Sequence, residues 1–240
     1  DLTSAYSSMS EKWRESTTST ATTTDLHHGG YYVLEIYNEE PLKIGAVGIE
    51  SNPSEASKQH IPGSTIRGAL IAQLVKRGIF SSGKKGALSP TDVDFLQHVH
   101  CQNGYLYEGE QLYVPTPQHL RMDKHQYRKK KAIGEDVEIF DIGQEGEKAG
   151  GKNQLPHRYV SRKEDSFLAG NVKTSYRLHH STIRKPDERE RDNIYNYQAI
   201  APGQTFRVIV YDGGQNGERL EKILPPQHPQ TWYLGGARSA

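Results

Sequence analysis

The amino-acid sequence predicts an α+β protein whose strands pair antiparallel. Several runs rich in β-branched and aromatic residues are typical of strands, and segment 61–78 has the apolar spacing of a helix. Strand-like and helix-like segments do not alternate regularly, as they would in a parallel α/β sheet. With 34% hydrophobic residues and 23 glycines in 240 residues, the chain is expected to have a small core and long loop insertions.

The first 28 residues are predicted to be a linker or an extension. Residues 16–24 consist of Ser and Thr with one Ala, a composition without apolar periodicity that favours solvated backbone. Tyr31–Tyr37 is the first predicted strand because it is rich in aromatic and β-branched residues. Residues 29–240 are therefore expected to form one domain, either alone or as one module of a longer or fused chain.

A helix is predicted after the extended stretch Pro41–Gly45. Its apolar positions recur at the three- to four-residue spacing of a helix, and they are Ile66, Ala69, Leu70 and Leu74. Ser64 is expected to cap the first N–H groups of this helix, and Gly78 is expected to end it.

The middle of the chain predicts shorter elements. Asp94–His100 is expected to form a short helix. Tyr105–Tyr107 and Gln111–Val114 are expected to form strands separated by a turn. Residues 133–154 are rich in acidic residues and glycine, which predicts a flexible insert.

Three further strands are predicted near the C-terminus, over Val172–Ile183, Ile194–Ile200 and Thr205–Tyr211. A turn with the sequence Ala-Pro-Gly-Gln joins the last two. No segment approaches the roughly 20 apolar residues that a membrane helix requires, so the sequence excludes a membrane-spanning helix. The single cysteine, Cys101, cannot form an internal disulfide, and a reducing, intracellular compartment is expected.

Two segments concentrate positive charge, although the net charge of the chain is only +1. The first, 119–131, holds six Lys and Arg and two His against the single acid Asp123. It is either a solvated loop or a surface that a polyanion neutralises, with Tyr127 able to stack on a base. The predicted RNA contacts in this segment are His119, Arg121, Lys124, Tyr127 and Arg128.

The second basic segment begins at His157 and continues into the following strand. Basic residues at alternate positions of a strand project to one face, so those of 173–179 can line a groove. A surface strand with exposed charges is the alternative interpretation. The predicted RNA contacts in this segment are Arg158, Arg162, Lys163, Arg177 and His179.

No cofactor and no metal ion are expected. Adjacent histidines on a strand, as at 27–28 and 179–180, point to opposite faces and cannot readily bind one ion together. The glycine-rich stretches also lack the Gly-Lys-Ser/Thr ending of a nucleotide-binding loop.

Four phrases of the sequence, taken together, resemble the RAMP superfamily of CRISPR-associated RNA-binding proteins. These phrases are Pro41–Gly45, Ile61–Leu70, Ile194–Phe206 and Leu234–Ala240. Within the superfamily, the sequence is most similar to type III-D members related to the Cas-five-type subunit, which caps the 5′ handle of the guide RNA.

The resemblance implies a ferredoxin-like (RRM-like) fold with helices on one face of the sheet. It also implies a subunit in a prokaryotic cytoplasm that binds crRNA, contacts target RNA indirectly, and docks onto other RAMP subunits and the large subunit of a type III complex. In the family, a Pro-Gly-Ser turn with its helix and a glycine-rich loop near the C-terminus contact the RNA. Carried over to this chain, those residues are Gly63, Ser64, Thr65, Arg67, Gly235, Gly236 and Arg238.

Two other functions stay open. An endoribonuclease of this superfamily would cut target RNA with a loop aspartate, for which the candidates are Asp92, Asp94 and Asp123. Alternatively it would process precursor guide RNA by acid–base chemistry with His119, His125 or His179. A generic RRM-like module would instead carry exposed aromatic residues on its central strands in the RNP pattern, which Tyr31–Tyr37 does not contain.

Overall fold

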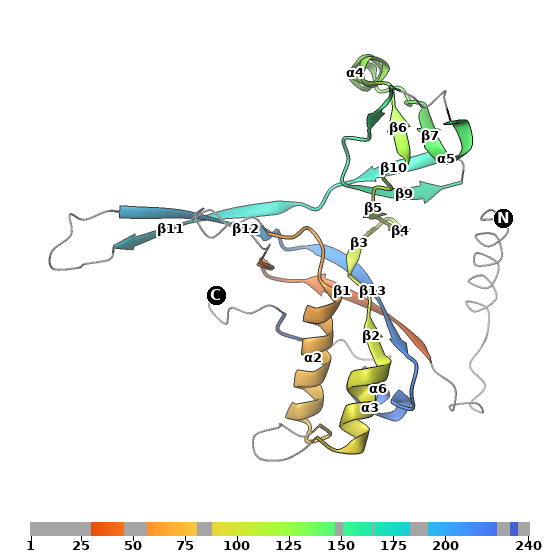
Figure 1. Cartoon of the computed structure of the whole chain (residues 1–240). Coiled ribbons are helices and arrows are strands. Elements are labelled where there is room, and N and C mark those ends of the chain that lie inside the picture. The colour runs from red at the N-terminus through yellow and green to blue at the C-terminus, as the bar shows by residue number, and fades with distance from the viewer. Residues whose placement is uncertain are drawn as a thin grey trace.

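The computed structural model describes residues 30–45, 57–80, 88–146, 151–164, 166–182, 192–224 and 231–234. These residues form a body of sheet and helices, a small lobe at one end, and a two-stranded arm that projects from the body (Figure 1). Within these ranges, no helix is both long and apolar enough to cross a membrane.

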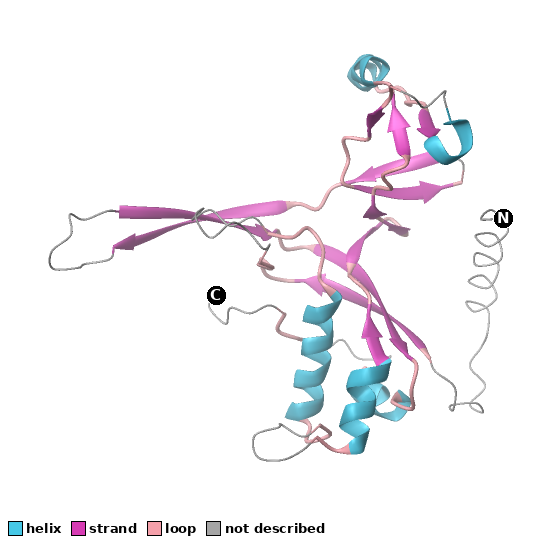
Figure 2. Cartoon of the chain, in the orientation of Figure 1, coloured by secondary structure: helices cyan, strands magenta, loops and turns pink. Residues whose placement is uncertain are grey.

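The body is built on a five-stranded antiparallel sheet. Its strands are β1 (Tyr31–Asn38), β13 (Gln204–Asp212), β2 (Val99–Cys101), β3 (Tyr105–Glu108) and β4 (Gln111–Leu112). β13 is central, because it pairs with β1 on one side and with β2 and β3 on the other. The predicted α+β class with antiparallel strands is confirmed (Figure 2).

The strand order is that of a split βαβ unit. β1 is followed by helix α2 (Gly63–Lys76) and helix α3 (Pro90–His98), and the chain then returns to the sheet as β2 and β3. β13 inserts between these two arms of the unit and is antiparallel to both, and helix α6 (Gly217–Ile223) follows it. This order is the one in which the first three strands of a ferredoxin-like fold are arranged.

Helices α2, α3 and α6 cover one face of the sheet (Figure 2). The side chains of β13 alternate, so that Phe206, Val208 and Val210 are buried under this helical layer. The helices contribute the other half of the core, which includes Ile66, Leu70, Leu74, Phe95, Leu220 and Ile223. The opposite face of the sheet carries the intervening, more exposed residues.

The predicted helix over 61–78 is confirmed, and its end follows the sequence signal. Gly78 has φ +69°, the Gly78 N–H donates to the Val75 carbonyl at 3.0 Å, and the Ile79 N–H donates to the Leu74 carbonyl at 2.9 Å. These two bonds form a Schellman motif, in which glycine supplies the left-handed residue.

The predicted cap at Ser64 is wrong. The N-cap lies two residues earlier, at Pro62, and the helix has no side-chain cap. The Gly63 N–H instead donates to Asn103 Oδ1 at 3.0 Å, in the loop after β2. A Cβ at Gly63 would lie 2.0 Å from the Cys101 carbonyl oxygen, so this close approach of helix and strand requires glycine.

The short helix predicted over Asp94–His100 is present as α3, which begins four residues earlier and ends two residues earlier. Ser89 caps it by accepting the Asp92 N–H, and Pro90 occupies its first turn. The last residues of the predicted helix belong to β2, because they pair with β13. This pairing joins positions more than a hundred residues apart.

The arm consists of β11 (Thr174–Thr182) and β12 (Asp192–Ile200), which pair antiparallel over nine positions. A short turn connects β12 to β13, and the three strands predicted in this part of the chain are confirmed. The buried amide of Gln204 ties the base of the arm to the body. Its Oε1 accepts the Lys173 N–H, and its Nε2 donates to the Lys173 and Ala201 carbonyls, all at 2.7–2.9 Å. Its backbone N–H donates to Asn38 Oδ1.

The lobe contains two three-stranded sheets. One is formed by β5 (Val114–Pro115), β9 (Tyr159–Lys163) and β10 (Ser166–Gly170), and the other by β6 (Leu120–Met122), β7 (Ile139–Asp141) and β8 (Asn153–Gln154). Helices α4 (Lys124–Ile133) and α5 (Ile142–Glu145) also belong to the lobe, so they lie apart from the helical layer of the body. The acidic composition of 133–154 did not predict β7, α5 or β8.

Candidate nucleic-acid interface

A hollow of about 510 Å³ lies beside the N-terminus of α2. Its lining comes from α2, α3 and β2, and consists of Gly63, Ser64, Arg67, Gly68, Ile71, Leu96, His100 and Cys101. The amino end of a helix attracts anions, because its free N–H groups and its dipole point outward. The fold therefore brings together three of the four residues predicted in this turn, whereas Thr65 does not line the hollow.

Arg67 joins α2 to α3 at the edge of the hollow. Its Nη2 donates a hydrogen bond to the Leu96 carbonyl oxygen. Its Nε is buried without a hydrogen-bond partner in the part of the chain that the structure describes. The guanidinium is thus held in place by the protein, so a positive charge is already positioned before an anion arrives.

Cys101 lines the hollow but does not supply a nucleophile. Burial raises the pKa of its thiol to about 11, and the nearby Arg67 only partly opposes this effect. The thiol is therefore protonated at neutral pH, and a protonated thiol is a poor nucleophile and a poor metal ligand.

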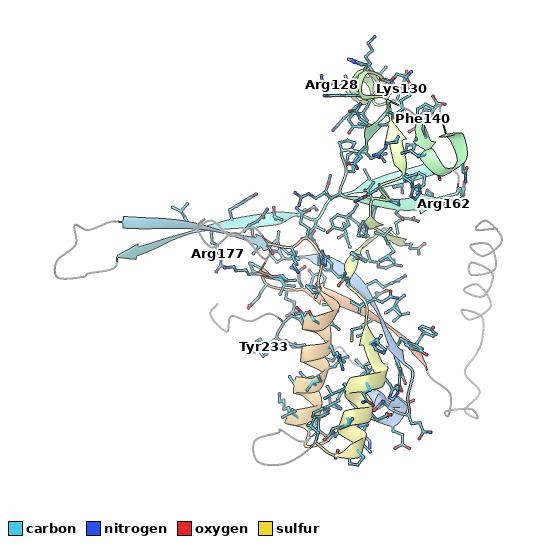
Figure 3. The ribbon with its side chains drawn as sticks, in the orientation of Figure 1. Arg128, Lys130, Phe140, Arg162, Arg177 and Tyr233 are labelled. Carbon is cyan, nitrogen blue, oxygen red and sulfur yellow. The ribbon has the colours of Figure 1, made fainter. Side chains whose placement is uncertain are left out.

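The first basic segment, predicted to be either a solvated loop or a surface that contacts phosphates, forms β6 and α4. Asp123 caps α4 through Oδ1, which accepts the backbone N–H groups of His125 and Gln126, and Gly134 ends the helix with φ +74°. None of the α4 side chains is buried. Figure 3 shows Arg128 and Lys130 on this helix, at the far end of the lobe.

Asp123 is engaged by three donors. Its Oδ2 lies 3.1 Å from Lys152 Nζ, in addition to the two backbone bonds at Oδ1. The hydrogen bonds, that from the Gln126 N–H first, lower the pKa of its carboxyl to about 2. Asp123 is therefore an anionic helix cap, which accounts for the single acid in a basic segment.

Tyr127 and the second basic segment meet inside the lobe. Tyr127 Oη lies 3.0 Å from His157 Nε2, and Lys131 Nζ lies 5.4 Å from the centre of the Tyr127 ring. Of the other predicted contacts, Arg121 is half-buried on β6, while His119, Lys124 and Arg128 are exposed. The lobe thus gathers the predicted residues of segment 119–131 around one basic helix.

The remaining predicted contacts lie on other elements, some of them in the lobe and others on the arm. Arg158 precedes β9, and the exposed Arg162 and Lys163 lie at its end (Figure 3). Arg177 is exposed on the arm, where it is in register with Tyr197, and the backbone of His179 is in register with Tyr195. Gly235, Gly236 and Arg238 lie outside the described residues.

The candidate catalytic residues are not brought together. Asp92 is buried and forms an ion pair with Arg219, while Asp94 accepts a hydrogen bond from Asn216 and pairs with His98. Asp123 and His125 lie in the lobe, at the opposite end of the molecule from α3 (Figure 1). In the ranges that the structure covers, no cluster of three or more His, Cys, Asp and Glu could hold a metal ion.

The outer face of the sheet was not predicted from the sequence as a binding surface. Tyr31, Tyr211 and His100 are direct neighbours across β1, β13 and β2. The ring centres of Tyr31 and Tyr211 are 4.9 Å apart, and those of Tyr211 and His100 are 6.3 Å apart. The signal available in the sequence was the alternation of Tyr31, Val33 and Tyr37 on one side of a strand.

No protein-family model matches the chain, and no curated protein matches it either. Among solved structures, it is similar to a chain of the type III-B Cmr-beta bound to cognate target RNA and AMPPnP. The identity is 16%, the match covers 87% of this chain and 60% of that chain, and the TM-score is 0.43. The chain therefore spans about 60% of the length of that protein.

Two further similar chains come from the type III-B Cmr-beta. One is from the form bound to cognate target RNA, with 8% identity, 88% of this chain and 93% of that chain covered, and a TM-score of 0.40. The other is from the apo state, with 9% identity, 87% of this chain and 92% of that chain covered, and a TM-score of 0.41.

Proposed function

We propose that this chain is a guide-RNA-binding subunit of a type III CRISPR effector ribonucleoprotein. In this proposal it holds the 5′ repeat-derived handle of the crRNA and docks onto adjacent RAMP subunits. The observation that carries the proposal is the placement of the Pro-Gly-Ser-Thr-Ile-Arg phrase. The residues that most resemble a RAMP protein line an open hollow at a helix N-terminus, where Arg67 is already fixed in position.

The hollow has the chemistry of a phosphate site. Ser64 is exposed and offers a hydroxyl group at the amino end of the helix, where the dipole favours an anion, while the Gly63 and Thr65 N–H groups already donate to Asn103 Oδ1 and to the Pro62 carbonyl. The Arg67 guanidinium adds positive charge, and the half-buried apolar residues Ile71 and Leu96 limit access of water on the other side. Phosphate oxygens of an RNA backbone match these donors without any requirement for base identity.

The lobe and the arm extend the surface that an RNA can contact. α4 presents most of its cations to solvent, because Lys124, Arg128, Lys129 and Lys131 are exposed and only Lys130 is half-buried. Charges of one sign at this density raise the local concentration of a polyanion and contribute salt-dependent affinity. Arg177 provides a further cation on the arm, beyond the body.

Binding rather than cleavage is the better-supported role. The candidate carboxylates have other partners: Asp92 is paired with Arg219, Asp94 with Asn216 and His98, and Asp123 with Lys152. A cleaving site would require an acid and a base within hydrogen-bonding reach of one phosphodiester. The candidates Asp92 and Asp94 of α3 lie at the opposite end of the molecule from those of the lobe (Figure 1), and within the lobe Asp123 is engaged as the cap of α4.

The test is binding of a fluorescent single-stranded RNA with the handle sequence, compared with a scrambled RNA of equal length. Ser64→Glu places a negative charge at the hollow and is expected to weaken handle binding about tenfold or more, because it removes charge-assisted hydrogen bonds to phosphate. Ala72→Glu adds the same charge to an exposed position of the same helix that does not line the hollow, and is expected to change affinity little. Equal weakening in both variants, or no binding of the handle RNA in the presence of partner subunits, would overturn the proposal.

A further inference from the structure

The outer face of the central sheet is rich in exposed aromatic side chains. Tyr31 is 73% exposed, Tyr37 is 61% exposed and Val33 is 54% exposed, all on one side of β1. No described part of the chain covers these residues. Exposed aromatic and aliphatic side chains grouped on one face are unusual unless that face binds a ligand or a partner.

Three of the rings form a row across three strands. Tyr31, Tyr211 and His100 occupy the same register position on β1, β13 and β2. The planes of Tyr211 and His100 are only 14° apart, and those of Tyr31 and Tyr211 are 34° apart. Each of the three side chains is solvent-accessible, so the row offers aromatic surface at the spacing of neighbouring strands.

The charged side chains Glu35 and Arg207 on this face form an ion pair with each other. Arg207 Nη2 lies 2.5 Å from Glu35 Oε1, and the Arg207 guanidinium lies 3.4 Å from the centre of the Tyr107 ring. The face therefore offers ring stacking without an excess of positive charge. It suits the bases of a nucleic acid better than the phosphates, which need a separate cationic site.

The phosphate site proposed above lies next to this row. His100 is the last ring of the row and also lines the hollow that contains Ser64 and Arg67. A strand of RNA with a phosphate in the hollow can therefore turn its next bases onto His100 and then onto Tyr211. This shared residue favours RNA over a protein as the occupant of the face.

We propose that the Tyr31–Tyr211–His100 row is a stacking platform for nucleobases of the single-stranded RNA whose backbone is held at the hollow. This inference rests on the proposed function, because the hollow supplies the phosphate contacts. Every base has a π face that can stack on an aromatic ring, so the platform provides affinity with little sequence preference.

The experiment separates the contribution of the bases from that of the phosphates. Two RNAs of equal length are compared, one with all its bases and one in which the bases are replaced by abasic riboses. The paired change Tyr31→Leu and Tyr211→Leu keeps apolar bulk but removes the rings. It is expected to weaken binding of the complete RNA about tenfold or more and to leave binding of the abasic RNA unchanged.

The control variant carries Tyr31→Phe and Tyr211→Phe, which retain the rings and are expected to bind both RNAs as the unaltered chain does. Thermal melting establishes that each variant is folded. Ser64→Glu, in contrast, is expected to weaken both RNAs, because it acts on the phosphate contacts. Crosslinking of RNA containing 4-thiouridine to Tyr31 or Tyr211, mapped by mass spectrometry, provides a direct readout of stacking.

Three outcomes overturn the platform. If Ser64→Glu weakens binding but the paired leucine variant does not, the platform is wrong and the proposed function stands. If the unaltered chain binds neither RNA, with partner subunits present, the proposed function and the platform both fail. If the leucine variant changes the oligomeric state and not the RNA affinity, the face is a protein interface instead.

Discussion

The hydroxyl oxygen of Tyr127 lies 3.0 Å from Nε2 of His157, and this contact joins the basic helix α4 to the segment that leads into β9. The two rings meet at 67°, with centres 6.1 Å apart. The contact explains why a helix with no buried side chain is nevertheless fixed on the lobe. It also makes the lobe sensitive to the protonation of one imidazole.

Burial, with a smaller effect from the charge of Lys131, lowers the pKa of His157 below its ordinary value of 6.5. The unfolded chain therefore takes up this proton at a higher pH than the folded chain does, and the stability of the fold decreases as the pH falls below 6.5. His157→Gln removes the titrating group and is expected to flatten the dependence of the melting temperature on pH in this range. His125→Gln, an exposed change in the same lobe, is the control, and a profile flattened equally by both changes would contradict the prediction.

Glycine-to-alanine changes at two positions of α2 are expected to have opposite effects. At Gly63 the added Cβ would lie 2.0 Å from the Cys101 carbonyl oxygen, a backbone atom that cannot move aside, so Gly63→Ala is expected to cost about 3 kcal/mol or more. At Gly68 no atom lies within 4 Å of the added Cβ, so Gly68→Ala is expected to stabilise by roughly 1 kcal/mol through helix propensity. Urea denaturation of both variants checks the prediction, which a destabilised Gly68→Ala would contradict.

Arg219 is predicted to be essential for stability. Its guanidinium pairs with the buried Asp92, donates to the Ile79 and Thr91 carbonyls at 2.8 and 2.6 Å, and lies over the Phe80 and Phe95 rings. Arg219→Met leaves the Asp92 carboxylate buried without this cation, which is expected to cost about 3–5 kcal/mol. If melting shows little change in stability but RNA cleavage by an assembled complex disappears, Asp92 has a chemical role that the ion pair does not explain.

The cations of α4 are expected to determine how steeply RNA affinity depends on salt. Arg128 and Lys129 are exposed, and changing both to Gln is expected to reduce the slope of log affinity against log salt concentration by about 1.4, or about 0.7 for each phosphate that is no longer neutralised. Lys76→Gln with Lys222→Gln removes two exposed charges from the helical layer and serves as the control. Anisotropy titrations at several salt concentrations measure both slopes, and identical slopes would show that α4 does not bind the RNA.

The elements that could be predicted from the sequence are those with a local signal. β1, α2 and the strands of the arm each have a periodicity or a turn that decides their conformation within a few residues. α4 carries such signals too, in the Asp123 cap and Gly134, but its lack of an apolar stripe concealed it. Without a buried face, the charge pattern alone could not separate this helix from a loop.

The parts that could not be predicted depend on contacts between distant segments. The hollow requires α2 to meet β2, and the aromatic row requires β13 to lie between β1 and β2, a register that spans 180 residues from Tyr31 to Tyr211. Tyr31–Tyr37 alone could not reveal the row, because the row takes one ring from each of three strands. The partner of Asp92 is likewise 127 residues away, at Arg219.

The side chain of Gln204 has a mechanical consequence for the arm. It is buried at the junction where β11 begins and β12 ends, and it holds both legs of the arm while its own strand runs through the centre of the sheet. Because β13 is paired on both edges, a force along the arm acts on the central strand of the sheet and not on a flexible joint between two bodies. The described strands of the arm are thus anchored in the core through Gln204, and a force on β11 or β12 passes to the strand that carries Tyr211.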